Sequence, residues 1–385
     1  MDKARFKKLF NDYVVRSKEA YSNFACKDEV AFRLKEDDNC LIRTEFAIDR
    51  DRILYSGAYR RYQGKTQVFS FTNMFDEETS NRSLHTTYVS QISRTIANML
   101  GLNLDLVEAI ALGHDLGHPP FGHDGEVALS KCCQNAGIGS FHHNVQSLHI
   151  VDNISNEGSG LNLTFQTRDG IISHDGEVHH QILKPERNKS EDVIQSYIAK
   201  KRNEENISWM PSTLEGCVVR ISDTIAYIGQ DIEDAIRLKI LDRKKIPIKC
   251  AQYLGNTNSE IIDTLVKSVI LNSFGKDQIA FDEETSYHLF ELKKFNYEKI
   301  YTNEKVKTAQ LKINRSMDVL FNQYLKDIQT ENKRSSIFNH FLNSKNDRYR
   351  ATYSNAEMVR DFISTMTDRY YNEEVKNYFL PGSFY

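Results

Sequence analysis

The segment HDLGHPPFGHDGE, residues 114–126, contains three histidines and three carboxylates within thirteen residues. Apolar residues recur at helical spacing over 104–116, so a buried helix is expected to end at the His114-Asp115 pair. The glycines and prolines that follow predict a turn, and a second helix is expected over 123–133. A turn directly after the pair allows both of its side chains to face one point. The segment therefore predicts a polar site between helices.

Histidines cluster along the chain in a way that supports this site. Ten of the twelve fall between His85 and His180, which scattered core or surface histidines would not do. His85 and the later Asp223 complete, with His114 and Asp115, a set of imidazole and carboxylate ligands. Such a set suits Mn²⁺, Fe²⁺, Ni²⁺, Co²⁺ or Zn²⁺ and leaves positions for water and a substrate oxygen. Metal-activated water is typical of phosphohydrolases.

Two longer segments are expected to be the helices that carry His85 and Asp223. One is residues 81–100, which is followed by a glycine stop. Its apolar stripe is predicted to be Leu84, Tyr88, Ile92, Ile96 and Met99. In the other, residues 214–237, Asp223 and Tyr227 lie one turn apart on one face. The chain has only six prolines and no convincing alternation of β-branched residues, so it is predicted to be mainly helical with few strands.

Two other segments carry less chemistry. Residues 186–206 are highly charged and are expected to form a solvated insertion or mobile loop instead of a core element. Residues 244–385 show helical spacing, are rich in Tyr and Phe, and contain no internal repeat.

Composition sets wider limits. With 385 residues and 40% hydrophobic content, the chain can form one large or two ordinary domains. A formal net charge of −3 gives no basic signature for nucleic acid. The six cysteines form no CxxC pair, and the sequence shows neither a signal peptide nor about 18 consecutive apolar residues. We therefore expect reduced thiols in a soluble cytoplasmic protein without a membrane partner.

Several stretches carry a family resemblance. The main ones are RSLH at 82–85, HDLGHPPFGHDGE at 114–126, FHHNVQS at 141–147 and SDTIAY at 222–227. Supporting ones are DRDRILYSGAYRRYQGKTQVF at 49–69, NLTFQTRDGII at 162–172 and MTDRY at 366–370. Together they resemble the HD-superfamily deoxynucleoside triphosphate triphosphohydrolases, the dGTPase family. The length of HDLGHPPFGHDGE argues against chance similarity.

The resemblance implies a mainly α fold, an HD-domain helical fold with a metal site between helices and a helical C-terminal region. Residues 1–240 would form the catalytic core with an N-terminal nucleotide-binding segment, and residues 241–385 would pack on it. The implied reaction is hydrolysis of dGTP or several dNTPs between the α-phosphorus and the 5′-oxygen, which yields a deoxynucleoside and tripolyphosphate. The implied cofactor is a divalent metal ion, with Mn, Mg, Fe and Ni all open.

The departing 5′-oxygen needs a proton. His123 and Glu126, at i and i+3, form an acid and its orienting partner by spacing, and the resemblance assigns this pair to catalysis. By resemblance, His118 hydrogen-bonds an α-phosphate oxygen and His143 is a second histidine that faces the phosphates. The family usually has Glu before this second histidine, where the chain has His142, so the register of the two histidines stays open.

Basic side chains are predicted to bind phosphate. Arg82, three residues before His85 and thus on the same helical face, is placed to neutralise phosphate charge. A basic cluster suits either the β- and γ-phosphates or solvent, and it consists of Arg60, Arg61 and Lys65.

Three residues are predicted to contact the nucleoside. Tyr227 resembles the family tyrosine that packs against the sugar and excludes a 2′-hydroxyl. Asp231, one turn further, is expected at the 3′-hydroxyl. Gln67 has the amide chemistry to read a base edge, although a buried structural glutamine is an equal alternative.

Other functions remain open on the sequence. The chain could be an HD-type nucleotidase or phosphodiesterase that acts on another nucleotide phosphoester, or a non-catalytic dNTP sensor. The filled ligand and acid positions argue against the sensor, and the charge gives no support for a nucleic-acid partner. The resemblance implies a homo-oligomer, a tetramer or hexamer, and in some relatives a second, allosteric dNTP. Base preference stays undetermined.

Overall fold

The structure is a computed structural model that describes residues 19–37, 40–67, 81–174, 179–204 and 209–379, with four isolated positions besides and the backbone alone of 304–309. Almost all of its regular structure is helical. The one sheet in this part of the chain pairs two short antiparallel strands, β1 (Ile182–Leu183) and β2 (Ile279–Ala280). The predicted mainly α fold with few strands is confirmed. None of the described helices is long and apolar enough to cross a membrane.

The helices fall into two groups along the chain. The first group is α2 (Glu45–Leu54), α3 (Gly57–Arg60), α4 (Arg82–Met99), α5 (Leu104–Gly113), α6 (Gly122–Asn135), α7 (His143–His149), α8 (Ser155–Gly158), α9 (Phe165–Ile172), α10 (Glu191–Arg202) and α11 (Leu214–Arg237). The second group is α12 (Ile248–Leu254), α13 (Asn258–Ser273), α14 (Glu283–Asn296), α15 (Glu304–Gln329), α16 (Ser336–His340), α17 (Asp347–Thr352), α18 (Asn355–Ser364) and α19 (Asp368–Phe379).

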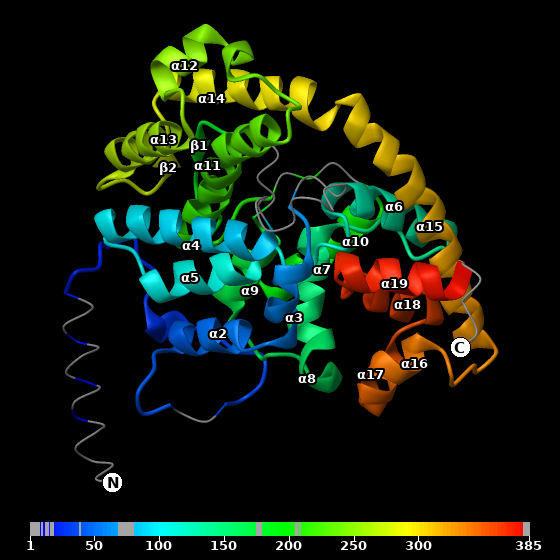
Figure 1. Ribbon diagram of the computed structural model, residues 1–385. Coiled ribbons are helices and arrows are strands. Elements are labelled where there is room, and N and C mark those ends of the chain that lie inside the picture. The colour runs from blue at the N-terminus through cyan, green and yellow to red at the C-terminus, as the bar shows by residue number, and fades with distance from the viewer. Residues whose placement is uncertain are drawn as a thin grey trace.

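One hydrophobic cluster lies where α4, α5 and α11 pack together, and α12, α13 and α14 extend it. In Figure 1, α4 lies above α5, and α12 to α14 gather at the top of the molecule. Because α4 and α11 belong to this cluster, its packing sets where the side chains of these two helices meet.

The predicted stripe of α4 is wrong at both ends. Leu84 is 40% exposed and Met99 is 53% exposed. At about 100° per residue, two four-residue steps separate Leu84 from the buried Ile92 by about 80°, and the final three-residue step turns Met99 back by about 60° from the buried Ile96. Steps of four, three and four remain on the buried face, which includes His85, Val89, Ile92 and Ile96.

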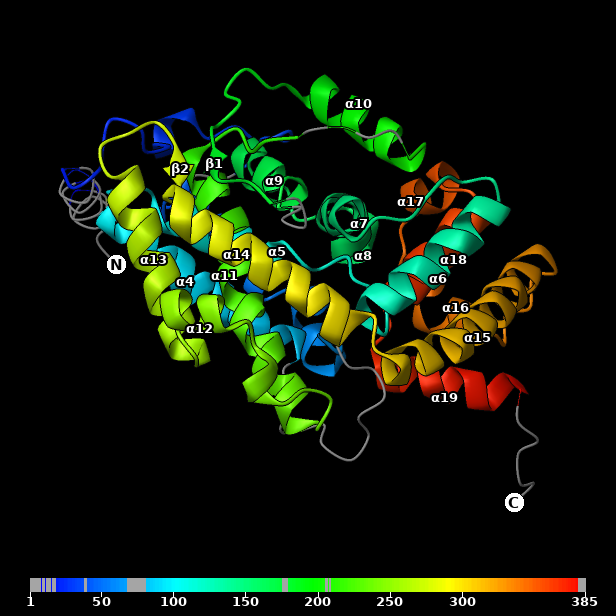
Figure 2. The same cartoon turned by 90° about the horizontal axis from the view of Figure 1, so that it is seen from above.

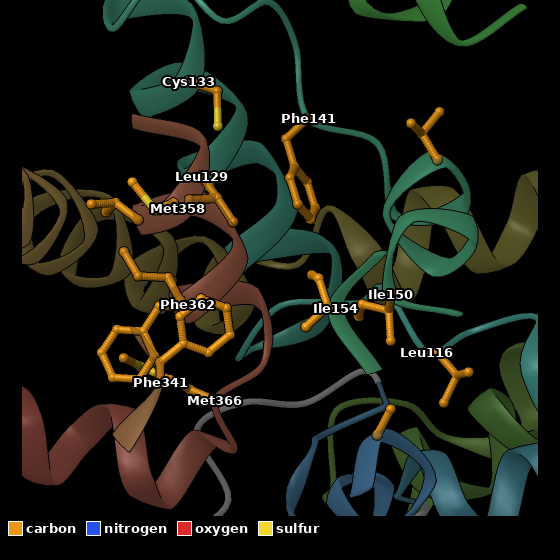
Figure 3. Close-up of a cluster of buried hydrophobic side chains, with 14 of the residues drawn as sticks. Leu116, Leu129, Cys133, Phe141, Ile150, Ile154, Phe341, Met358, Phe362 and Met366 are labelled. Carbon is orange, nitrogen blue, oxygen red and sulfur yellow. The ribbon is translucent and has the colours of Figure 1, made fainter. Parts of the chain in front are cut away.

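A second hydrophobic cluster joins α6 and α7 to the C-terminal helices. Figure 3 shows Leu129 and Cys133 of α6 beside Met358 and Phe362 of α18. The long helix α15 runs from the end of α14 along α6 (Figures 1 and 2). Residues after 241 thus contribute to both hydrophobic clusters, and they support the helices that flank the predicted site.

The prediction of a solvated or mobile loop over 186–206 is wrong. Most of this segment forms α10, in which Ile194 is fully buried and Tyr197 is 2% exposed. The ring of Tyr197 stacks on Trp209 with centroids 4.2 Å apart. Two apolar side chains at i and i+3 are enough to dock a helix that has charged residues at both ends, and the charge of the segment hid this pair.

Candidate active site

Four side chains with metal-ligand chemistry converge where α4, α11 and the end of α5 meet. His85 lies on α4, His114 caps the C-terminus of α5, Asp115 follows it, and Asp223 lies on α11. His85 Nε2 is 2.9 Å from Asp223 Oδ1 and 3.9 Å from Asp115 Oδ2. His114 Nε2 is 3.5 Å from Asp115 Oδ2 and 4.0 Å from Asp223 Oδ1. The structure therefore brings together all four residues that the sequence predicts as ligands.

The spacing of these atoms fits a divalent ion. Bonds of about 2.0–2.2 Å separate neighbouring ligand atoms by about 3.0–3.4 Å in octahedral or tetrahedral arrangements. The separations of 2.9 and 3.5 Å are close to this range, whereas those of 3.9 and 4.0 Å are wider. His85, His114 and Asp115 each place one ligand atom within 4.8 Å of the other two. His114 Nδ1 lies 2.7 Å from Ala111 O and must carry the proton, because a carbonyl oxygen only accepts. The lone pair is therefore on His114 Nε2, a buried atom with no hydrogen-bond partner among the described residues. A cation bound there would satisfy it, so these four residues could hold a metal ion.

Arg82, the first residue of α4, is directed at the same cluster. It is 1% exposed, and its Nη1 donates to Asp115 Oδ2 at 2.5 Å. Its Nε and Nη2 atoms are buried and have no partner in the part of the chain that the structure describes. The absence of a side chain at Gly122 permits this approach, since a Cβ there would lie 3.3 Å from Arg82 Nη2. A buried guanidinium with two remaining donors suits an anionic oxygen.

Three further histidines form a column beside Asp115. The ring of His118 stacks on His143 with centroids 3.9 Å apart, and His143 Nε2 lies 3.1 Å from His174 Nε2. Asp115 Oδ1 is 3.2 Å from His118 Nε2 and 3.7 Å from His174 Nε2. Burial, and then the charge of Arg82, hold the pKa of His118 well below its usual value. His118 is therefore neutral at neutral pH and can act as a hydrogen-bond donor or acceptor.

His174 is a site residue that the sequence did not reveal. Burial, and then its neighbour His114, lower its pKa to about 4, so this ring is also neutral. Its Nδ1 lies 2.6 Å from Ile171 O, the carbonyl three residues earlier. His114 makes the same contact with Ala111 at the end of α5. The usable signal was therefore a histidine just past a helix C-terminus, here two residues after NLTFQTRDGII.

Glu126 lies between two histidines. Its carboxylate is 2.9 Å from His143 Nδ1, accepts from the His143 backbone N–H at 2.7 Å, and is 3.6 Å from His123 Nδ1. Burial alone would raise the pKa of Glu126, but the charges and hydrogen bonds of His143 and His123 hold it well below its usual value. The side chain of His123 is 57% exposed, whereas those of His143 and Glu126 are 12% and 15% exposed. His123 is thus the member of this group that an incoming molecule can reach.

The register between the two adjacent histidines is clear in the structure. His143 faces Glu126, His118 and His174, whereas His142 Nε2 lies 2.9 Å from Lys201 O on α10. His142 therefore points out of the site.

The residues predicted to contact a nucleoside lie on two elements. Tyr227 and Asp231 follow Asp223 along α11 at one-turn intervals. Tyr301 donates a hydrogen bond to Asp231 Oδ2 at 2.5 Å, and burial raises the pKa of Asp231 to about 7 despite this bond. Asp231 Oδ1 and Gln67 Oε1 are buried without a partner among the described residues. Both atoms can accept from a ligand, and Tyr301 is a neighbour that the sequence did not reveal.

A basic pocket adjoins the ligand cluster on α11. Thr224 and Arg220 line it from the turns next to Asp223, and Lys293 lines it from α14. Its other lining residues are His179, His180, Leu183, Ile221, Phe281 and Leu289. None of these described residues is acidic, so the pocket favours an anion.

Lys65 does not fit the predicted basic cluster. Its side chain is buried, and its ammonium donates to the backbone carbonyls of His118 and Ser364. It therefore faces neither solvent nor an open phosphate site. Burial, and then the charge of Arg61, hold the pKa of Lys65 well below its usual value.

Comparison with known proteins places this site in a family. A family model described as "HD domain" matches residues 82–228, and one described as "Phosphohydrolase-associated domain" matches residues 279–377. A "Deoxyguanosinetriphosphate triphosphohydrolase-like protein" of Caldanaerobacter subterraneus subsp. tengcongensis is 37% identical over 98% of this chain and 94% of its own length. Proteins of the same name from Desulfatibacillum aliphaticivorans and Clostridium tetani are each 34% identical. They match 94% and 91% of this chain and 95% and 89% of their own lengths.

Proposed function

This chain belongs to the HD-domain family of deoxyguanosinetriphosphate triphosphohydrolase-like proteins, and we propose that it hydrolyses deoxynucleoside triphosphates to a deoxynucleoside and tripolyphosphate. Family membership supports the coarser statement, a metal-dependent phosphohydrolase. The observation that carries the finer proposal is the convergence of two features. Four metal-ligand side chains meet at one point, and beside them lies a buried guanidinium with two unpartnered donors.

The α-phosphate would be bound beside the ligand cluster. A divalent ion held by His85, His114, Asp115 and Asp223 would supply an activated water molecule and polarise a phosphate oxygen. The Nε and Nη2 donors of Arg82 bind a non-bridging oxygen and offset its charge. In this proposal the rings of His118 and His143, which lie beside Asp115 and Glu126, also face the phosphate oxygens.

His123 would supply the proton that the leaving group needs. Its exposed ring can meet the 5′-oxygen, and the carboxylate of Glu126 favours the protonated ring and orients it. As the bond between phosphorus and the 5′-oxygen breaks, the proton moves from His123 to that oxygen. The deoxynucleoside then leaves as a neutral alcohol and not as an alkoxide.

The rest of the substrate has matching surroundings on α11. The basic pocket lined by Arg220 and Lys293 provides cations for the β- and γ-phosphates. In the other direction along the helix, Tyr227 packs against the sugar, and Asp231 Oδ1 accepts from the 3′-hydroxyl. The amide of Gln67 is available to a base edge. A ribose would place a 2′-hydroxyl against Tyr227, which favours deoxyribose.

A product analysis tests this function. Purified protein is incubated with each of the four dNTPs, alone and mixed, and with GTP, in Mn²⁺ or Mg²⁺, and the products are separated by ion exchange. We expect a deoxynucleoside and tripolyphosphate, and no product from the Asp115→Ala variant. Monophosphate and pyrophosphate would contradict the site of cleavage. No product from any dNTP would favour a dNTP sensor or another phosphoester substrate.

A further inference from the structure

The sequence MTDRY at 366–370 has no role in the function proposed above, yet its aspartate makes a concentrated set of contacts. Asp368 Oδ1 accepts from the backbone N–H of Phe121 at 3.0 Å. Asp368 Oδ2 accepts from the backbone N–H of Thr66 at 3.0 Å and from its hydroxyl at 2.5 Å. One carboxylate at the start of α19 therefore connects two segments that lie far away along the chain.

The contact with Phe121 fixes the start of α6. Phe121 is the N-cap residue of α6 and adopts a left-handed conformation with φ of 67°, which a residue with a bulky side chain rarely accepts. Its backbone N–H is held by Asp368, and its ring packs edge-on against Tyr371 with centroids 5.0 Å apart. His123 follows two residues later, so the direction of this turn sets where its ring lies.

The contact with Thr66 fixes the start of α4. Thr66 pairs with Asn81, the N-cap residue of α4, and the Arg82 N–H donates to Lys65 O at 3.1 Å. Arg82 is the first residue of α4, and Gln67 directly follows Thr66. The position of Thr66 therefore determines the position of the Arg82 backbone, from which the side chain extends to Asp115.

Neighbours of Asp368 support the same junction, which we call the C-terminal clamp, residues 364–371. Ser364 O accepts from the Lys65 ammonium, which also donates to His118 O. Thr367 lies so close to Gly64 that an added Cβ would be 2.8 Å from its side chain. The clamp thus contacts the segment before α4 and the turn before α6 at several points, and Asp368 is where both meet.

We propose that Asp368 is a positioning residue for hydrolysis. Its carboxylate fixes the start of α4 relative to the start of α6, so that Arg82 and His123 both face the same phosphate. The inference rests on the proposed function. Asp368 itself does not touch the substrate. A carboxylate is required because all three of its partners are donors, and an amide would turn an N–H₂ group toward one of them.

The test compares Asp368→Asn with Glu373→Gln, a matched loss of charge at an exposed position on the same helix. Four quantities are measured on each metal-loaded protein: kcat and KM for the preferred dNTP, bound metal, and hydrogen exchange of peptides covering 65–67 and 118–126. For Asp368→Asn we expect faster exchange in both peptides, unchanged metal, KM within threefold of wild type and kcat at least tenfold lower. Glu373→Gln should match wild type throughout.

Two results would overturn the proposal. One is exchange equal to that of Glu373→Gln, which would mean that Asp368 does not hold the helix starts. The other is faster exchange with unchanged kcat, which would mean that alignment does not depend on it. If Asp368→Asn does not fold, Thr66→Val removes one of the three bonds and should lower kcat at least threefold with KM unchanged. If wild type hydrolyses no dNTP, the proposed function fails by itself, and exchange alone decides whether Asp368 holds the two helix starts.

Discussion

Asp115 connects the two groups of side chains in the site. Its Oδ2 atom faces His114 and Arg82, and its Oδ1 atom faces His118 and His174. Burial alone would raise the pKa of Asp115, but the charges of His114 and Arg82 hold it well below its usual value. A single buried carboxylate therefore serves the ligand cluster, the guanidinium and the histidine column together.

Replacing Asp115 should remove both metal and activity. Asp115→Ala deletes one proposed ligand and leaves the guanidinium of Arg82 buried without its carboxylate, a change that typically costs about 3–5 kcal/mol. We expect loss of bound metal by elemental analysis, loss of turnover, and a lower free energy of unfolding in urea. Asp263→Ala, at an exposed aspartate, is the control. Wild-type metal content in Asp115→Ala would contradict the ligand assignment.

Replacing His123 should separate binding from chemistry. His123→Ala removes the proposed acid but none of the four proposed ligands, so bound metal and KM should stay near wild type. The expected loss in kcat is about 10²–10⁴-fold, the usual contribution of a general acid. Steady-state kinetics measure kcat and KM, and elemental analysis measures bound metal. A rate near that of wild type would show that another group protonates the leaving oxygen.

At the scale of elements, the turn after α5 is fitted closely to α7. Gly117 N donates to Ser147 Oγ at 2.8 Å, and that hydroxyl donates to His114 O at 2.6 Å. A Cβ on Gly117 would lie 2.2 Å from both His143 O and Ser147 N. The helix that carries His143 can therefore approach His114 and Asp115 only because residue 117 has no side chain.

Gly117→Ala should disturb stability and activity together. The added methyl must push α7 away from the turn, and overpacking of this kind costs about 1–3 kcal/mol. Because α7 carries His143, we also expect a fall in kcat of at least tenfold. Gly57→Ala is the matched control, since its Cβ would lie 3.5 Å from the nearest atom, the end of the Arg61 side chain. Urea unfolding and steady-state kinetics are measured on both variants. Equal free energies of unfolding and equal kcat values would exclude a steric role for Gly117.

At the scale of the whole molecule, a buried network joins the C-terminal helices to α7. Asp361 of α18 accepts from Gln146 at 3.0 Å, from Tyr349 at 2.7 Å and from Arg360 at 2.8 Å, and lies 2.9 Å from His149 Nε2. Burial alone would raise the pKa of Asp361, but Arg360 and these hydrogen bonds lower it far below its usual value. The folded structure therefore favours the ionised carboxylate.

This network predicts acid-dependent stability. Because the folded pKa of Asp361 lies below the unfolded value of about 3.9, its contribution is fully present above the unfolded pKa and is lost as pH falls toward the folded one. Asp361→Asn should lower the free energy of unfolding by about 3–5 kcal/mol at pH 7. Its difference from wild type should shrink steadily below about pH 5. Urea titrations of both proteins from neutral to acid pH measure this, and a difference independent of pH would contradict it.

The sequence by itself determined the residue types and much of their local order. Contacts within a few residues determine three features: the end of α5 at His114 and Asp115, the turn after them, and the one-turn spacing along α11. Helical periodicity in the sequence predicts such contacts. The mainly α fold was predicted for the same reason. The buried face of α4 and the burial of α10 were not predicted correctly, because both depend on which surface of the protein each helix packs against.

Only the tertiary structure decided how the site is completed. His174 enters it from the end of α9, Glu126 lies nearer His143 than His123, and Asp368 reaches Phe121 across 247 positions of the chain. No periodicity records these pairs, since each is created when two hydrophobic clusters bury their helices at particular angles. Local spacing therefore determines which groups a helix offers, and long-range packing determines which of them meet.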